Sequence, residues 1–340
     1  MSFWSNTNND NGSDGCSAPP LESSSTWGAG YLIYLLFSLS LPTIIYSALY
    51  LLPFVVSFFK PVPDLKKKYN AKWALVTGGG SGIGKGLVFG LARMGLNVVI
   101  VTLPDPTLEP LLKKLRETFP ELEFRAVPVS FSPNVDYMAP IKKETSDITI
   151  QLIFNNAGFI VTGFFEATDE MKHLMNLECN ARAAVRITHH FLRILVTKKL
   201  KGCICFTSSV AGYIPTPFAV MYASTKAFVS QFSSCVAIEV ANLGIDVCAV
   251  HPSPVNSNFY DKVEHKIQLM EDAKKAAVEP DSITGDIFKS IDSWYLRDLG
   301  AMAIGTRLGT SFIPYNFFTG MFAAAAPFLG DYKTHNAKRG

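Results

Sequence analysis

The stretch Thr77-Gly78-Gly79-Gly80-Ser81-Gly82-Ile83-Gly84 lies between a segment that predicts a strand, Ala74–Thr77, and a segment that predicts a helix, 82–94. Glycines let a backbone turn sharply and approach a pyrophosphate closely. The first turn of the following helix offers free N–H groups to an anion. A glycine-rich turn in this position therefore predicts a dinucleotide-binding βα unit.

The rest of residues 72–260 repeats this alternation of strand and helix. The further strand-like segments are Asn97–Thr102, Glu123–Val129, Gln151–Phe154, Gly202–Thr207 and Asp246–Val250, and the further helix-like segments are 106–117, 169–198 and 219–242. Such alternation predicts a parallel sheet with helices on both faces. We therefore expect an α/β fold, a Rossmann-type doubly wound sheet, with residues 72–260 forming one dinucleotide-binding catalytic domain.

The composition excludes two classes of function. A net charge of +3 is too small to indicate a nucleic-acid partner. The six cysteines show no metal-ligand spacing, so we expect no metal site. Cys203 and Cys205 alternate along a strand-like segment, which indicates buried thiols in a reducing compartment.

The hydrophobic excess of the chain begins near its N-terminus. Residues 1–27 are rich in Asn, Ser and Gly and are expected to be disordered. Residues 28–59 contain no Asp, Glu, Lys or Arg, and this run of 32 residues exceeds the roughly 20 that a membrane-spanning helix needs. Pro42 and Pro53 leave two arrangements open, a kinked span or a short hairpin. We expect a transmembrane anchor here.

The charges on either side of the anchor predict its orientation. Five lysines follow it closely, whereas the residues before it include three acids and no Lys or Arg; the lysines are Lys60, Lys66, Lys67, Lys68 and Lys72. The positive-inside rule then places the catalytic domain in the cytosol.

The tail, residues 261–340, combines a charged segment with a second uncharged run. Asp261–Lys275 is helix-like, and Leu308–Gly330 contains no charged residue but is broken by Pro314 and Pro327. A second span would carry the basic C-terminus into the lumen, against the charge rule. We therefore expect a substrate lid and a membrane-associated segment at the interface.

Four residues form a candidate catalytic group. Tyr222 and Lys226 lie one helical turn apart, and a nearby cation favours the phenolate of a tyrosine whose usual pKa is near 10. Ser209, at the end of a strand, can hydrogen-bond a substrate oxygen, with Ser208 as its competitor. Asn180 can hold a water that relays protons toward Lys226.

These motifs together resemble the short-chain dehydrogenase/reductase family. The resemblance rests on the glycine-rich turn, the run Asn155-Asn156-Ala157-Gly158, the four candidate catalytic residues, and Pro252-Ser253-Pro254-Val255-Asn256-Ser257, which looks like the family's Pro-x-x-Val-x-Thr segment. It implies hydride transfer with a nicotinamide cofactor, Tyr222 as acid or base, Ser209 as carbonyl polariser and Lys226 as a ribose ligand. The implied cofactor contacts are Thr77, Gly78, Ser81, Gly82, Ile83, Gly84, Asn156, Ala157, Gly158, Tyr222, Lys226, Pro252 and Val255.

A narrower resemblance extends beyond these motifs. The apolar N-terminal run, followed by Phe59–Tyr69 and Lys72–Gly78, looks like the membrane-bound very-long-chain 3-oxoacyl-CoA reductases, which are grouped with 17β-hydroxysteroid dehydrogenase-like enzymes. That subgroup implies NADPH, the endoplasmic reticulum membrane and reduction of a long-chain 3-oxoacyl-CoA in fatty acid elongation.

The chain departs from the subgroup at three positions. Ser81 replaces an aspartate, Leu103 replaces an NADP-reading arginine, and Ser130 replaces an acidic residue. Thr102 stands where an NAD-preferring enzyme has an aspartate. NADPH is therefore expected from the resemblance alone, with NADH as the alternative.

The sequence leaves other functions open. A hydroxysteroid or retinol-type dehydrogenase would use the same catalytic residues on a rigid lipid, and a catalytically silent membrane scaffold would keep the fold without turnover. Many family members pair through the helices that correspond to 169–198 and 219–242, so the resemblance makes a homodimer possible.

Overall fold

The computed structural model describes residues 24–337, except for 261, 262, 264, 266 and 276. The chain divides into two compact units, Met1–Val55 and Val56–Gly340. Most of the segment expected to be disordered, residues 1–27, lies outside the described residues.

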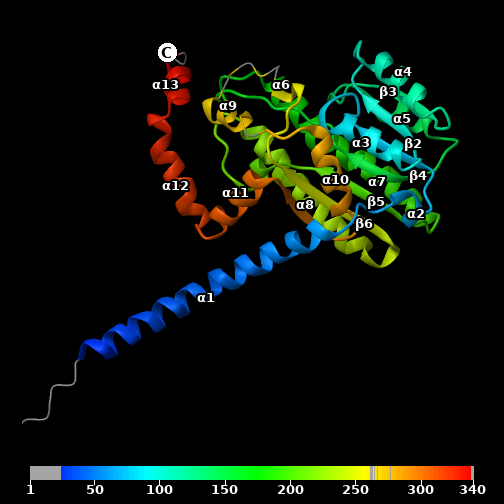
Figure 1. Ribbon diagram of the computed structural model, residues 1–340. Helices are drawn as coiled ribbons and strands as arrows, with labels where there is room; N and C mark the ends of the chain where they lie inside the picture. The colour runs from blue at the N-terminus through cyan, green and yellow to red at the C-terminus, as the bar shows by residue number, and fades with distance from the viewer. Residues whose placement is uncertain (1–23, 261–262, 264, 266, 276, 338–340) are drawn as a thin grey trace, which may run out of the picture. The chain divides into compact units, whose positions relative to one another are not determined.

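The second unit is built on a seven-stranded sheet in the order β3-β2-β1-β4-β5-β6-β7 (Figure 1). All neighbouring strands are parallel. The strands are β1 (Trp73–Thr77), β2 (Asn97–Thr102), β3 (Phe124–Pro128), β4 (Ile150–Asn155), β5 (Gly202–Thr207), β6 (Ile245–Pro252) and β7 (Leu296–Leu299). The expected doubly wound α/β fold is confirmed. The sheet also extends beyond residue 260, because β7 pairs with the C-terminal half of β6.

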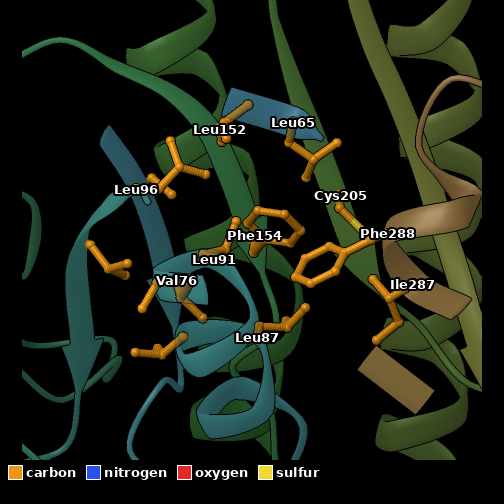
Figure 2. Packing of buried hydrophobic residues seen from close by; sticks show 14 of the residues in the cluster. Leu65, Val76, Leu87, Leu91, Leu96, Leu152, Phe154, Cys205, Ile287 and Phe288 are labelled. Carbon is orange, nitrogen blue, oxygen red and sulfur yellow. The ribbon is translucent and has the colours of Figure 1, made fainter. Parts of the chain in front are cut away.

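Helices cover both faces of this sheet and bury a separate core on each. One core contains apolar side chains of α3 (Gly82–Arg93), α4 (Leu108–Thr118) and α10 (Pro280–Ser290). Figure 2 shows this core, where Phe154 of β4 meets Phe288 of α10 edge to face, with ring centroids 6.0 Å apart. The other core contains side chains of α5 (Met138–Glu144), α7 (Ala183–Thr197) and α8 (Val220–Val240).

The long helix expected over 169–198 is interrupted. It consists of α6 (Glu170–Leu177), a π-helical turn (Glu178–Arg182) and α7. Buried Glu178 accepts a hydrogen bond from Tyr137 Oη at 2.6 Å and pairs with Arg182 at 2.8 Å. Such π turns are rare and often occur at functional positions, and this one contains Asn180.

The N-terminal helix α1 (Ser24–Phe59) is continuous through Pro42 and Pro53. The alternative of a short hairpin is therefore wrong. The segment Gly30–Phe59 has a mean hydropathy of 1.9 and is long and apolar enough to cross a membrane.

The C-terminal tail forms short helices. After α9 (Gln268–Lys274) and α10, the chain forms α11 (Ala301–Ser311), α12 (Tyr315–Ala325), a 3₁₀ turn (Ala326–Phe328) and α13 (Gly330–Asn336). Pro314 and Pro327 lie at the breaks, where a missing N–H and a fixed φ end or interrupt a helix. At 11 residues, α12 is shorter than the roughly 20 residues that a membrane span needs.

Candidate active site

The glycine-rich turn connects β1 to α3 and depends on two of its glycines. Gly78 has φ +65°, and a Cβ atom there would lie 2.9 Å from the Cα of Ala157. A Cβ on Gly84 would collide with the carbonyl oxygen of Gly78. Any larger side chain at these positions would force the turn away from the end of β4.

Hydrogen bonds tie the ends of three neighbouring strands together beside this turn. Thr77 Oγ1, at the end of β1, accepts hydrogen bonds from the N–H groups of Asn156 (2.9 Å) and Ala157 (3.0 Å). Asn156 Nδ2 donates to the Thr77 carbonyl at 3.1 Å, and its Oδ1 accepts from Thr207 Oγ1 at 3.1 Å. Thr77, Asn156 and Ala157 thus form the floor at the carboxyl edge of the sheet, where ligands bind in open α/β folds.

The start of α3 fits a pyrophosphate. The side chain of Ser81, the N-cap residue, makes no capping hydrogen bond, so it satisfies none of the first-turn N–H groups of α3. These N–H groups, those of Gly82 and Ile83 among them, and the positive end of the helix dipole would hold a phosphate anion. From the other side, the Cβ of Ser257 lies 3.1 Å from where a Cβ on Gly82 would stand. The segment that begins at Pro252, the last residue of β6, therefore reaches the turn.

Val255 is buried in that same segment. It forms a parallel bridge with Val278, and the Asn256 N–H donates to the Val278 carbonyl at 2.9 Å. The bridge fixes the path of the chain between β6 and Ser257.

The end of β2 is neutral where a dinucleotide's adenosine ribose would lie. Thr102 Oγ1 is 2.7 Å from the position of a Cβ on Gly80. Leu103 is 54% exposed. Neither side chain offers the carboxylate that binds a 2′-hydroxyl or the cation that binds a 2′-phosphate.

Tyr222 and Lys226 lie on the same side of α8, as their spacing predicts. The Lys226 ammonium nitrogen is 5.6 Å from the centre of the Tyr222 ring and donates to the Thr207 carbonyl at 2.7 Å. Lys226 is buried, and this burial lowers its pKa to about 8. The lysine therefore gives up its proton much more readily than a lysine in water.

The phenol of Tyr222 is held in its protonated form. Part of the side chain remains exposed, but burial of its phenolic end raises its pKa, and the charge of Tyr260 adds to this. A hydrogen bond with Ser209 acts in the opposite direction and is smaller. The lowering of the Tyr222 pKa expected from Lys226 is not seen, because desolvation of the phenol raises this pKa. A protonated phenol is the form that can donate to a carbonyl oxygen.

The structure distinguishes the two neighbouring serines. Ser209 begins the turn Val210–Tyr213 and hydrogen-bonds the Tyr222 phenol. Ser208 is buried, donates to the Lys226 carbonyl at 2.8 Å and lies 2.8 Å from Ser230 Oγ. Ser209 is thus beside the Tyr222 phenol, whereas Ser208 supports the backbone of α8.

Asn180 and Lys226 both lie close to the backbone at Gly158 and Phe159. Asn180 Oδ1 accepts from the Phe159 N–H at 2.9 Å, and its Nδ2 donates to the Phe159 carbonyl at 2.9 Å. A Cβ on Gly158 would lie 3.2 Å from Asn180 Oδ1 and 3.3 Å from Lys226 Nζ. A cavity of about 10 Å³, the size of one water molecule, is lined by Asn180 and by Asn155. The asparagine side chain therefore fixes the 158–159 backbone directly next to Lys226.

His251, Ser230 and Asp298 form a buried cluster that the sequence does not predict. His251 Nε2 is 2.8 Å from Ser230 Oγ, and its Nδ1 lies 3.4 Å from Asp298 Oδ1. Burial lowers the pKa of His251 to about 4, so the ring is neutral. Its ring also packs against Tyr213, with centroids 5.6 Å apart. The sequence contains no signal for this cluster, because Asp298 lies on β7, outside the predicted domain.

The sequence of this chain is similar to those of known dehydrogenases. Residues 72–268, more than half of the chain, match the short chain dehydrogenase family. The chain is 28% identical over 219 residues to 17-beta-hydroxysteroid dehydrogenase type 3 of Mus musculus, covering 63% of this chain and 70% of that one. It is 34% identical over 187 residues to the very-long-chain 3-oxoacyl-CoA reductase of Mus musculus, covering 53% of this chain and 58% of that one. A very-long-chain 3-oxoacyl-CoA reductase-like protein of Arabidopsis thaliana is 27% identical over 216 residues, which cover 63% and 69% of the two chains.

Solved structures share the fold. A 7beta-hydroxysteroid dehydrogenase superposes with a TM-score of 0.66 at 22% identity, covering 76% of this chain and 98% of that one. A short-chain dehydrogenase from Sphingobium yanoikuyae gives 0.61 at 24% identity, covering 72% and 96%. With the family match, the fold and the glycine-rich turn in agreement, this chain is a member of the short-chain dehydrogenase family, an oxidoreductase that interconverts CH–OH and C=O groups with a nicotinamide cofactor.

Proposed function

We propose that this chain reduces a long-chain 3-oxoacyl-CoA to the 3-hydroxyacyl-CoA, the reaction of fatty acid elongation, with NADPH as the cofactor. The observation that carries the chemistry is the protonated Tyr222 phenol, hydrogen-bonded to Ser209 and one helical turn from buried Lys226. The substrate class follows from the names of the relatives and from the apolar helix α1, since lipid substrates partition into membranes.

Each catalytic residue has a distinct role in the proposed reaction. The nicotinamide, when bound, supplies a hydride to the carbonyl carbon. Tyr222 donates its proton to the carbonyl oxygen, and the Ser209 hydroxyl donates a hydrogen bond to the same oxygen as negative charge develops there. The ammonium of Lys226 stabilises the phenolate that remains and is positioned to bind the ribose hydroxyls. Asn180 fixes the 158–159 backbone and lines the water-sized cavity, where a water would continue the proton path.

The other proposed contacts hold the cofactor. Gly78, Ser81, Gly82, Ile83 and Gly84 surround the pyrophosphate at the start of α3. The nicotinamide end lies along the chain segments that contribute Asn156, Ala157, Gly158, Pro252 and Val255. NADPH is chosen over NADH on the names of the relatives, because Thr102 and Leu103 are neutral.

The location follows from the anchor. Helix α1 spans the endoplasmic reticulum membrane, and the lysines that follow it keep the catalytic unit in the cytosol. A homodimer would form through α6, α7 and α8, where Leu174, Leu177 and Phe228 are exposed.

A second candidate function is a hydroxysteroid or retinol-type dehydrogenase. One relative is named 17-beta-hydroxysteroid dehydrogenase type 3. The ring centroids of Phe259 and Tyr222 are 5.8 Å apart, and those of Phe259 and Tyr260 are 5.1 Å apart. The flat ring system of a steroid or retinoid would therefore find aromatic partners beside the phenol. A silent scaffold is the weakest candidate, because Ser209, Tyr222 and Lys226 are all present.

The test follows nicotinamide absorbance with the full chain in membranes and a Tyr222→Phe control. NADPH and NADH are each offered with a long-chain 3-oxoacyl-CoA and, separately, with a ketosteroid. Tyrosine-dependent oxidation of NADPH by the acyl-CoA alone supports the proposal. Turnover of the steroid alone selects the second candidate, and equal rates in wild type and Tyr222→Phe reject the mechanism.

A further inference from the structure

The last three helices form an arm that is attached to the catalytic unit at both ends. We define the C-terminal arm as residues 301–336. At its start, Arg307 Nε pairs with Asp298 Oδ2 of β7 at 3.2 Å. At its end, the Gln268 N–H donates to both carboxylate oxygens of Asp331, each at 3.0 Å. Figure 1 shows α12 between these attachments and outside the layers of sheet and helices.

The middle of the arm is apolar and has no buried residue. No charged residue occurs from Leu308 to Gly330. Tyr315, Phe317 and Phe328 are 62%, 64% and 77% exposed, and no residue of α12 is buried. Contiguous exposed apolar surface of this kind identifies a binding surface. The uncharged run is bounded by Arg307 and Asp331, as in a segment whose centre meets lipid and whose ends stay in water.

The chain itself indicates what covers this surface. Helix α1 is apolar over Gly30–Phe59 and long enough to cross a membrane. Lys60, the next residue, forms an ion pair with Asp292 at 2.7 Å. The chain therefore passes from the apolar helix to an ion pair of the catalytic unit within one residue, without a linker. Helix α12 is about 16 Å long at 1.5 Å per residue, which suits an interfacial helix and not a span.

Aromatic side chains connect the arm with the loop before α8, the helix that contains Tyr222. Tyr332 of α13 meets Phe164 edge to face, with centroids 5.5 Å apart, and Phe164 meets Phe218 at 5.1 Å. Phe218 lies four residues before Tyr222, and its unusual φ of +64° is stabilised by a hydrogen bond from the Gly163 N–H to its carbonyl at 2.8 Å. The arm is thus packed, through Phe164, against the loop that leads into the helix of Tyr222.

We propose that α12 inserts into the lipid interface of the bilayer that holds α1, and that the arm delivers the apolar chain of the substrate from that bilayer to Tyr222. The delivery step rests on the proposed function, since it requires a lipid substrate. The insertion of α12 is independent of turnover.

Insertion is tested with the full chain in phosphatidylcholine vesicles. An environment-sensitive fluorophore is attached to a single engineered cysteine, Phe317→Cys, in a background with Cys16→Ser and Cys235→Ser. The control places the same probe on α4 by Lys113→Cys, since this lysine is 78% exposed. We expect a blue shift and quenching by brominated lipid at position 317 and neither at position 113. Absence of lipid quenching at 317 overturns the insertion. A blue shift that depends on protein concentration, without lipid quenching, assigns α12 to contact with a second copy and overturns it as well.

Delivery is tested with Phe317→Glu/Met321→Glu, which adds two charges to exposed positions of α12. We expect KM for a long-chain substrate in vesicles to rise about tenfold or more, with kcat and KM for a short, water-soluble 3-oxoacyl substrate unchanged. Equal kinetics of wild type and variant on the long-chain substrate reject delivery. If position 317 is quenched but no lipid ketone is turned over, the proposed function fails while the insertion stands.

Discussion

The guanidinium carbon of Arg307 lies 3.6 Å from the centre of the Tyr213 ring. Tyr213 closes the turn that begins at Ser209, and its hydroxyl donates to the Ala303 carbonyl at 3.0 Å. The first helix of the C-terminal arm therefore fixes the turn that contains a proposed catalytic hydroxyl, although about 100 residues separate the two along the chain.

Replacing Arg307 should destabilise the protein. In Arg307→Ala, the buried carboxylate of Asp298 loses its ion pair and Tyr213 loses the stacked cation, so we expect the free energy of unfolding to fall by about 2–4 kcal/mol. Urea denaturation in detergent measures this. Arg193→Ala, on the exposed face of α7, is the control and should change it by less than about 0.5 kcal/mol. An equal effect of both substitutions would contradict the role of the stacked pair.

Substitutions of the two serines that follow β5 should have different effects, one on kcat and the other on the free energy of unfolding. Ser209→Ala removes the hydroxyl proposed to hydrogen-bond the substrate oxygen and should lower kcat about 100-fold to 1,000-fold. Ser208→Ala leaves buried groups unpaired and should instead lower the free energy of unfolding by about 1–3 kcal/mol. Steady-state kinetics and denaturation are measured on both variants. If Ser208→Ala lost more kcat than Ser209→Ala, Ser208 and not Ser209 would be the residue that acts on the substrate.

The lowered pKa of Lys226 predicts a pH dependence. The free enzyme loses the ammonium charge as the pH rises through about 8, so kcat/KM for reduction should be constant below that pH and fall up to tenfold per unit above it. The unfolded chain keeps this proton up to about 10.5 and binds more protons between the two values. The free energy of unfolding contributed by this group therefore rises with pH across that window. In Lys226→Met, this contribution should be absent from the pH dependence of unfolding.

Gly158 should be intolerant of a methyl group. A Cβ there would stand 3.2 Å from Asn180 Oδ1 and 3.3 Å from Lys226 Nζ, so both groups must move by a few tenths of an ångström. We expect Gly158→Ala to lower kcat about tenfold, because small displacements of catalytic groups are costly. Gly285→Ala in α10 is the matched control. Its new methyl would meet only Val62 at 3.8 Å, so it should stabilise the helix by about 0.5–1 kcal/mol and leave kcat unchanged.

Leu103 should control the choice of dinucleotide. Leu103→Arg places a cation beside the proposed 2′-phosphate position, and Leu103 is exposed enough for this change to spare the core. We expect the ratio of kcat/KM for NADPH to that for NADH to rise about tenfold, the effect of one charge-assisted hydrogen bond. An unchanged ratio would show that the adenosine ribose lies elsewhere.

Much of the fold was predictable because its signals are local. Asn97–Thr102 and Gly202–Thr207 are strands with the predicted boundaries, since short apolar runs between polar or turn-forming segments leave few alternatives. β7 was missed because only four residues form it and Arg297 and Asp298 interrupt its apolar pattern. Their charges are paired with residues of other elements, namely Asp286, His251 and Arg307, and a pattern within the strand cannot reveal such pairs.

The candidate site was predictable only where the separation of two residues in the sequence fixes their relative positions in the fold. Tyr222 and Lys226 share one helix, so a separation of four residues already places them on one side. The choice between Ser208 and Ser209 needed the position of α8. Neighbouring residues at a strand end point in opposite directions, and the sequence does not show which of the two directions faces the Tyr222 phenol. The π turn at Asn180 was equally hidden, since its first residue, Glu178, is hydrogen-bonded to Tyr137, which is 41 residues away in the sequence.

The pairing of β7 with β6 also bears on the biosynthesis of the enzyme. During translation, helix α1 and every residue from Thr77 to Lys226 leave the ribosome before β7 does. Until Leu296–Leu299 arrives, β6 is an open sheet edge, which favours aggregation. Tyr213 meanwhile lacks Arg307. A ribosome stalled just before β7 would therefore leave a chain that contains all the family motifs but neither a complete sheet nor a fixed Ser209 turn. The exposed edge of β6 would then be the feature by which quality control recognises this chain.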